Sequence, residues 1–119
     1  MAHDDFDVIV YKVLAYIMAC AKADTVPRID KAKEIAGCGD VYWAMVIGSM
    51  LDDGLIMGAS VDSYYDGTTD VSATPRFGIT QQGARYLREN SKMAEAARFL
   101  GAAFQSALQV AVEATKALI

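Results

Sequence analysis

The segment between residues 55 and 79 constrains the fold more than any other part of the sequence. Two short apolar runs, residues 55–61 and 73–79, lie on either side of the sequence DSYYDGTTD. The pair of Asp66 and Gly67 is typical of a two-residue hairpin turn, because both turn positions need positive backbone φ. Pro75 cannot donate a hydrogen bond within a sheet, which favours an edge strand. The segment therefore predicts a β-hairpin with an acidic tip.

Helical patterns precede this hairpin. Apolar residues at spacings of three and four predict an amphipathic helix over residues 5–21 and a shorter one over 29–36. Asp40 is a suitable N-cap for a third helix, and Gly54 is its natural stop because glycine readily takes the left-handed conformation. The pattern assigns four residues of this third helix to the core: Trp43, Ile47, Met50 and Leu51.

Two further helices follow the hairpin. Thr80 is the expected N-cap of the helix QQGARYLREN, and residues 91–119 contain no proline and one glycine. This last stretch predicts a helix of up to 29 residues, about 40 Å long at about 1.5 Å per residue. Small and apolar residues recur along it at alternating spacings of four and three: Met93, Ala97, Leu100, Phe104, Ala107, Ala111, Ala114 and Leu118.

Such a seam has two interpretations. It can pair with its copy in a homodimer, the commonest closed symmetry, or it can fold back on the first helix. The length of the seam favours the homodimer, because so small a body cannot cover all of it. The residues predicted at the dimer interface are Leu100, Phe104, Ala107, Ala111 and Leu118.

The charges are distributed unevenly along the chain. The formal net charge is −4, and no lysine or arginine occurs between Lys33 and Arg76. Seven acidic residues fall in that interval: Glu34, Asp40, Asp52, Asp53, Asp62, Asp66 and Asp70. The middle of the chain is therefore acidic, and attraction to nucleic acid is not a property of the whole molecule.

Length and composition favour one folded, cytoplasmic domain. The chain has 119 residues, of which 54% are hydrophobic, and no run reaches the roughly 18 apolar residues of a membrane span. Its opening, MAHDDFD, has the wrong charge for a secretory signal. Cys20 and Cys38 lack the paired spacing of a zinc or redox motif. Cys20 is expected in a helix core and Cys38 in a turn.

Metal and catalytic sites are not predicted. A calcium loop would need oxygen ligands at its third and twelfth positions, which are Tyr64 and Ala73 when counted from Asp62. The only histidine is His3, near the N-terminus, so a histidine-based triad within the fold is not expected. The sequence contains no phosphate-binding glycine loop or nucleophile elbow. We therefore expect no enzyme activity, cofactor or metal.

The order of elements and two motifs resemble a known family. Three helices, a strand, an acidic hairpin, a strand and a capped helix follow the order of a winged helix-turn-helix. The sequences MVIGSMLDDGLIMG and FGITQQGARYLREN resemble the small winged-helix proteins of the YjcQ-like family, which occurs in bacterial and prophage genomes. The resemblance implies a mostly helical α+β fold with a two- or three-stranded wing over residues 1–90 and a helical extension over 91–119. It implies no settled biochemical role.

Two functions remain open for this fold. The third helix and the wing present tyrosine, methionine and aspartate where a DNA-binding protein would place basic residues. That pattern favours a protein partner with a basic surface, bound by an inhibitor that mimics nucleic acid. The residues predicted for this surface are Tyr42, Met45, Asp52, Asp62, Tyr64, Tyr65, Asp66 and Asp70.

The alternative is a dimeric DNA-binding transcriptional regulator. It would contact DNA through basic residues of the second helix and the returning strand: Arg28, Lys31, Lys33 and Arg76. A third interpretation is that the acidic residues form only a solvated face that keeps a dimer soluble.

Overall fold

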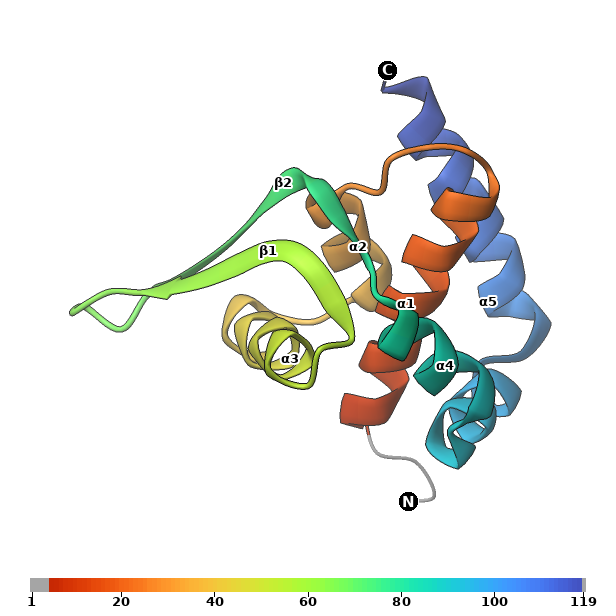
Figure 1. The fold of residues 1–119 in the computed structure, drawn as a ribbon, viewed down its shortest axis with the longest axis horizontal. Helices are drawn as coiled ribbons and strands as arrows, with labels where there is room; N and C mark the ends of the chain where they lie inside the picture. Colours follow the sequence, from red (N-terminus) through yellow and green to blue (C-terminus); the bar gives the residue numbers. More distant parts are fainter. Residues whose placement is uncertain (1–4, 119) are drawn as a thin grey trace.

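The computed structural model describes residues 5–118, and its fold is α+β, mostly helical and winged-helix-like. Five helices and a two-stranded antiparallel sheet are found among these residues. The hairpin of β1 and β2 extends away from the helices, with α3 lying beneath it (Figure 1). In chain order the elements are α1 (Asp5–Lys22), α2 (Ile29–Ala36), α3 (Asp40–Asp52), β1 (Ile56–Ser63), β2 (Thr69–Ile79), α4 (Gln81–Glu89) and α5 (Ser91–Ala117).

Helix α1 lies at the centre of the core. Its side chains Val13, Leu14, Tyr16 and Cys20 are completely buried. Cys20 is therefore in the helix core as predicted. Of the core residues predicted on α3, Trp43, Ile47 and Met50 are buried, and Leu51 is half-buried against the same cluster.

The start of α3 differs from the prediction by one residue. Gly39, with φ −76° and ψ 171°, is the N-cap, and Asp40 is the first helical residue. The carboxylate of Asp40 binds Lys33 of α2 instead of capping α3. The predicted N-cap role of Asp40 is wrong, because its side chain joins two helices.

The end of α3 and the start of α4 interlock. Gly54 has φ 72°, and the amide of Leu55 donates to the carbonyl of Met50 at 2.9 Å, which completes the predicted helix stop. The Thr80 hydroxyl donates to the Gly54 carbonyl at 2.6 Å and accepts from the Gly83 amide at 2.9 Å, as expected of the cap. A Cβ on Gly83 would collide with the carbonyl oxygen of Leu55. The two family-like motifs thus meet, and folding accounts for Gly54 and Gly83.

The hairpin is longer than predicted. An antiparallel ladder joins Ile56–Ser63 and Thr69–Ile79. The second strand begins at Thr69 and not at residue 73, because Thr69 and Val71 continue the alternating β pattern toward the hairpin tip. The register shifts between Met57 and Ala59, where Gly58 has φ 77°. A Cβ on Gly58 would collide with the backbone of Arg76 and Phe77. This bulge lies where the hairpin leaves the helical body.

The turn at the hairpin tip is not the predicted two-residue turn. The Tyr64 amide donates to the Thr68 carbonyl, and the Gly67 amide donates to the Tyr64 carbonyl, both at 3.0 Å. Only Gly67 of the turn has positive φ, at 88°. The loop therefore has three residues, with glycine at its left-handed position, and Asp66 needs no unusual backbone conformation.

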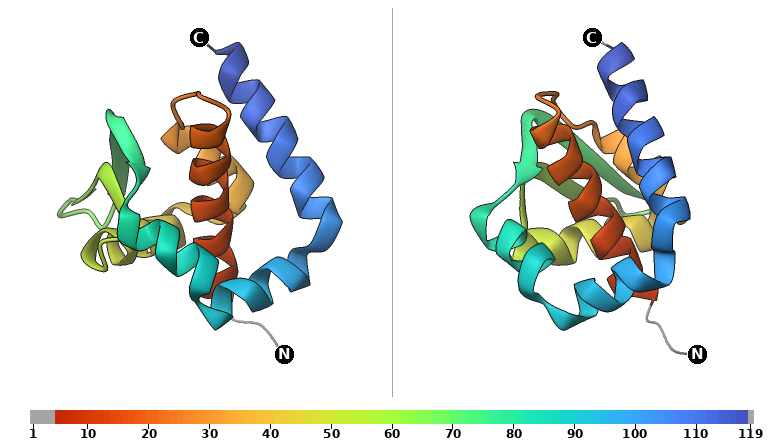
Figure 2. Two further views of the ribbon diagram at one scale, coloured as in Figure 1. Left: turned by 45° about the vertical axis from the view of Figure 1, so that its right-hand side comes forward. Right: turned by 90° about the vertical axis from the view of Figure 1, so that its right-hand side faces the viewer.

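Helix α5 is bent, in contrast to the single straight helix that was predicted. Gly101 has φ 66° and ψ −158°, a conformation that only glycine adopts readily, and it divides α5 into two parts. The second part turns and runs alongside α1 (Figure 2). Its buried face carries Phe104, Leu108, Val112 and Thr115.

A chain of hydrogen bonds crosses the core between α1 and α5. The Arg28 amide donates to the Tyr16 hydroxyl at 3.1 Å, and that hydroxyl lies 2.7 Å from Thr115 Oγ1. Thr115 in turn donates to the Ala111 carbonyl at 2.8 Å, so the Tyr16 hydroxyl is the donor to Thr115. Burial raises the pKa of Tyr16 to about 12 and also raises the pKa of the Cys20 thiol beside it.

Candidate interaction surfaces

The outer face of the hairpin carries two pairs of small polar side chains. Ser60 lies opposite Ser72, with their hydroxyl oxygens 3.1 Å apart, and Asp62 lies opposite Asp70. The alternate residues pack toward the helices: Ala59, Val61, Val71 and Ala73. The strands therefore separate a polar outer face from an apolar inner face.

The pairing of Asp62 with Asp70 is unfavourable for folding. Like charges directly opposite each other in an antiparallel sheet repel. Both side chains are exposed, and neither forms an ion pair with any residue of the described segment 5–118. Asp62 and Asp70 thus form an uncompensated negative site, which we call the aspartate pair.

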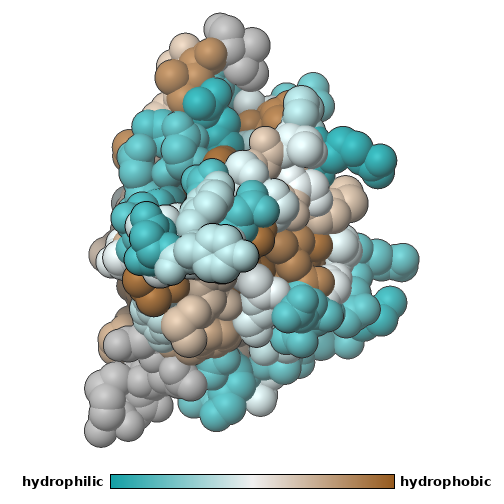
Figure 3. Space-filling model, turned by 90° about the vertical axis from the view of Figure 1, so that its left-hand side faces the viewer, coloured by the Kyte–Doolittle hydropathy of each residue, from teal (hydrophilic) through white to brown (hydrophobic). Residues whose placement is uncertain are grey.

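The hairpin tip adds two exposed aromatic rings to the aspartate pair. Tyr64 and Tyr65 are exposed and line a shallow hollow with Ser63 and Asp66. Seen from the tip, hydrophilic side chains cover much of this face beside smaller hydrophobic patches (Figure 3). Asp66 also has a structural role, because its carboxylate accepts hydrogen bonds from the Thr68 hydroxyl at 2.7 Å and the Thr68 amide at 3.0 Å. These bonds lower the pKa of Asp66.

Helix α3 contributes a smaller part of the surface than was predicted. Met45 is 60% exposed and Asp52 is exposed, but Tyr42 is half-buried and its ring lies 6.1 Å from that of Phe6. Tyr42 is therefore largely withdrawn from the surface by contact with α1. Val41, 65% exposed and one turn before Met45, was not included in the predicted site. Its position four residues from Met45 is the signal that could have identified it.

The basic residues of the alternative DNA-binding site are largely paired with acids. The Arg28 guanidinium donates to both carboxylate oxygens of Asp30, at 3.2 and 3.3 Å. Lys31 lies 3.5 Å from Glu34, and Lys33 binds Asp40. Arg76 forms no ion pair with another residue of the described segment. Three of the four cations are thus partly neutralised within the fold.

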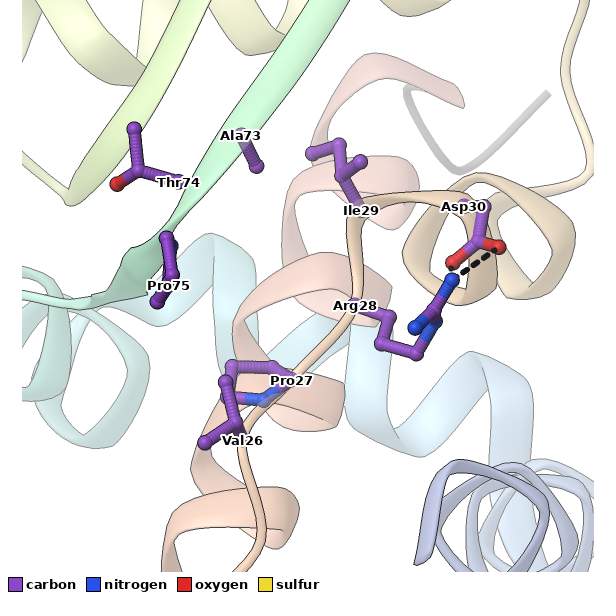
Figure 4. A pocket seen from close by; sticks show the side chains of 8 residues that line it. All are labelled: Val26, Pro27, Arg28, Ile29, Asp30, Ala73, Thr74 and Pro75. Carbon is purple, nitrogen blue, oxygen red and sulfur yellow. Dashed lines mark hydrogen bonds and ion pairs between the residues drawn. The ribbon is translucent and has the colours of Figure 1, made fainter. Parts of the chain in front are cut away.

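A groove of about 500 Å³ separates the residues before α2 from β2. Val26, Pro27 and Ile29 line one side, and Ala73 and Pro75 line the other (Figure 4). The ion pair of Arg28 and Asp30 lies at one end of the groove. Its apolar lining and paired charges offer no phosphate-binding cluster.

The described residues contain neither a metal-binding cluster nor a membrane-spanning helix. In the segment 5–118, no group of three histidine, cysteine, aspartate or glutamate side chains could hold a metal ion. None of the helices described is long and apolar enough to cross a membrane. His3 lies outside the described residues.

Comparison with known proteins identified one family. The family model described as YjcQ protein matches residues 11–103, from the middle of α1 to the bend in α5. Comparisons with curated proteins and with solved structures found no match.

Proposed function

The chain belongs to the YjcQ family, and we propose that it is a cytoplasmic, non-catalytic winged-helix module that binds a protein with a basic surface. The observation that carries this proposal is the aspartate pair on the outer face of the hairpin. Two carboxylates placed opposite each other reduce the stability of the hairpin. A lysine or arginine from a partner would relieve this repulsion on binding.

The hairpin tip supplies the remaining features of such a surface. Tyrosine is enriched at protein interfaces, where its ring buries a large area while its hydroxyl can stay hydrated. Tyr64 and Tyr65 are exposed next to the aspartate pair. Met45 and Val41 form an exposed apolar patch on α3. We propose that aromatic contacts anchor the partner and that the carboxylates select a basic one.

The chemistry of this surface favours mimicry of nucleic acid. A basic groove that normally receives phosphates would accept carboxylates at comparable positions. The protein would then act as an inhibitor of a nucleic-acid-handling protein, such as a host target of a prophage product. The proposal includes a homodimer that contacts its partner through two hairpins.

The second candidate is a DNA-binding regulator. The winged-helix arrangement and the exposed Arg76 favour it. The ion pairs of Arg28, Lys31 and Lys33 weigh against it, because each must be broken or shared before these cations can neutralise phosphates.

Affinity capture with charge-reversed variants tests the proposal. Tagged wild-type protein and a variant with Asp62→Lys and Asp70→Lys are incubated with bacterial lysate at low salt. The control carries Glu89→Lys on α4 and Glu113→Lys on α5, which change the net charge by the same amount as the hairpin variant. We expect the wild type and the control to capture the same basic protein, duplex DNA to displace it, and the hairpin variant to lose it. Equal capture by all three proteins would refute the role of the aspartate pair.

A further inference from the structure

We propose that two copies of the chain exchange residues 102–118, with Gly101 as the hinge. The proposal rests on the homodimer included in the proposed function, and it specifies how that dimer forms. In each copy, the second part of α5 would leave its own α1 and pack on the α1 of the other copy. The interaction surface is therefore the α1–α5 contact of the structure, and the partner is a second copy of this chain.

The first supporting observation is the bend itself. Gly101 interrupts α5 with φ 66° and ψ −158°, whereas the residues on either side are helical. No heavy atom beyond its chain neighbours lies within 4 Å of the position that a Cβ on Gly101 would occupy. Close packing therefore does not require glycine here, and the glycine backbone can adopt the helical conformation as well as the bent one.

The second observation is that the sequence pattern continues through the bend. The spacings of four and three run from Met93 and Leu100 before Gly101 to Phe104 and Ala111 after it. If Gly101 became helical, α5 would be one continuous helix with one apolar face. The two parts of α5 point in different directions in the structure (Figure 2), so straightening would carry the second part away from α1.

The third observation is the content of the α1–α5 contact. It buries Phe104, whose ring lies 5.8 Å from that of Tyr11, together with Leu108 and Val112. It also contains the hydrogen bond between Tyr16 and Thr115. Detachment would expose these apolar side chains to water and break the hydrogen bond between Tyr16 and Thr115.

A second copy in the same state restores every one of these contacts. It offers an uncovered α1 with the same Tyr11 and Tyr16, and a detached helix with the same Phe104 and Thr115. Reciprocal exchange forms a closed two-fold dimer, in which residues 102–118 of each copy pack on α1 of the other copy. The exchange therefore forms a dimer by reusing the α1–α5 contact, and no new complementary surface is needed.

A disulfide placed across this contact distinguishes exchange from folding back. The side chains of Cys20 and Thr115 are neighbours, because both lie within hydrogen-bonding reach of the Tyr16 hydroxyl and of each other. A variant with Thr115→Cys and Cys38→Ser therefore places two thiols together, one on each side of the contact. Oxidation by diamide gives a covalent dimer on a non-reducing gel if the segments are exchanged, and a monomer with an internal disulfide if they are not. The variant with Cys38→Ser alone is the control.

The hinge is tested separately by Gly101→Ala. Alanine strongly favours the helical conformation over the bent one, so we expect the association constant to rise by about a hundredfold, roughly tenfold from each chain. Sedimentation velocity over a range of concentrations measures it. The matched control is Gly48→Ala, because Gly48 lies inside α3 with no atom within 4 Å of its Cβ position, and it should leave the association unchanged.

The outcomes are distinct. Covalent dimers of the cysteine variant, with stronger association of Gly101→Ala, support the exchange. A dimer with internal disulfides overturns the exchange but retains the proposed homodimer, and a monomer at all concentrations overturns both. Capture through the hairpin is measured independently, so equal capture by the wild type and by the variant with Asp62→Lys and Asp70→Lys would refute the binding function without affecting this result.

Discussion

The basic side chains near helix α2 and the acidic side chains of the hairpin are accommodated in different ways. The three basic side chains at α2 each contact a carboxylate of the same fold. In the hairpin, Asp62 and Asp70 face each other without a cation from the described residues. The ion pairs place the charge at α2 within the fold, whereas we propose that the charge on the hairpin binds a partner.

The two regions are also attached to the body differently. The Arg28 amide, just before α2, donates to the buried Tyr16 hydroxyl, which links this region to α1 and α5. The hairpin is anchored at its base by Leu55, Ile56 and Phe77, while its tip is exposed. Changes near α2 or at the hairpin base should therefore reduce stability, and changes at the tip should mainly alter binding.

The largest effect is expected at the base of the hairpin. Gly58→Ala places a side chain at positive φ and against the backbone of Arg76 and Phe77. We expect the free energy of unfolding to fall by about 3 kcal/mol or more, because the bulge cannot be retained. Urea unfolding measures the loss, with Gly48→Ala as the control. Unchanged stability would show that the bulge does not fix the hairpin.

A smaller loss is expected where α2 is attached to the core. Tyr16→Phe removes the hydroxyl that binds the Arg28 amide and Thr115. The free energy of unfolding, measured in urea, should fall by about 1–3 kcal/mol. Tyr65→Phe, at an exposed ring, should cost almost nothing.

The same variant tests the pH dependence of Tyr16. Because the pKa of Tyr16 is raised to about 12, its contribution to stability is fully present below pH 10 and is lost as the pH rises from 10 to 12. Wild-type stability should therefore fall more steeply than that of Tyr16→Phe across this window. Parallel curves would contradict the burial of the Tyr16 hydroxyl, which is the cause of its raised pKa.

Releasing the cations near α2 should reduce the contrast between the two regions. Asp30→Asn and Asp40→Asn together remove the carboxylates that hold Arg28 and Lys33. We expect weak, salt-sensitive binding of duplex DNA to be detected by fluorescence anisotropy at low salt, at micromolar protein concentrations where the wild type shows none. Asp24→Asn with Glu95→Gln changes the net charge equally and should have a smaller effect. An equal effect would show that only net charge matters.

The smallest effects should have opposite signs within the hairpin. Asp62→Asn removes the repulsion from Asp70 and should stabilise the protein by a few tenths of a kcal/mol, a gain that added salt reduces. Asp66→Ala should instead destabilise it, because the bonds from Thr68 are lost.

Protonation provides a second test of Asp66. Hydrogen bonds from Thr68 lower the pKa of Asp66. Its contribution to the free energy of unfolding is therefore fully present above the ordinary carboxyl pKa and is lost as the pH falls through the lowered value. Urea unfolding from pH 7 to pH 3 should show the difference between wild type and Asp66→Ala shrinking. A constant difference would contradict the role of the carboxylate.

Local chemistry in the sequence was sufficient to predict much of the fold. Helix stops and caps such as Gly54 and Thr80 depend on residues close in the chain, and both are confirmed. The hairpin loop was predicted with two residues because Asp66 and Gly67 fit that turn, whereas the hydrogen bond between Tyr64 and Thr68 leaves three. The bend at Gly101 was missed because a single glycine is compatible with a continuous helix.

The candidate site could be predicted only in part. The acidic residues of the hairpin are evident from the charge distribution, and the structure places Asp62 opposite Asp70. The contact of Tyr42 with Phe6 and the acids next to Lys31 and Lys33 depend on how helices are placed in space. The hydrogen bond between Tyr16 and Thr115 joins residues far apart in the chain, so it could not be predicted from local sequence.

The central claim is that the charges of this winged helix are arranged for a basic protein and not for DNA. Fluorescence anisotropy of a labelled random duplex, titrated with wild-type protein at low salt, tests it most directly. The account predicts no binding at micromolar protein, and weak binding only after Asp30 and Asp40 are changed. Wild-type binding that falls steeply as salt is raised would contradict the account, because it would reveal phosphate contacts that the acidic hairpin should prevent.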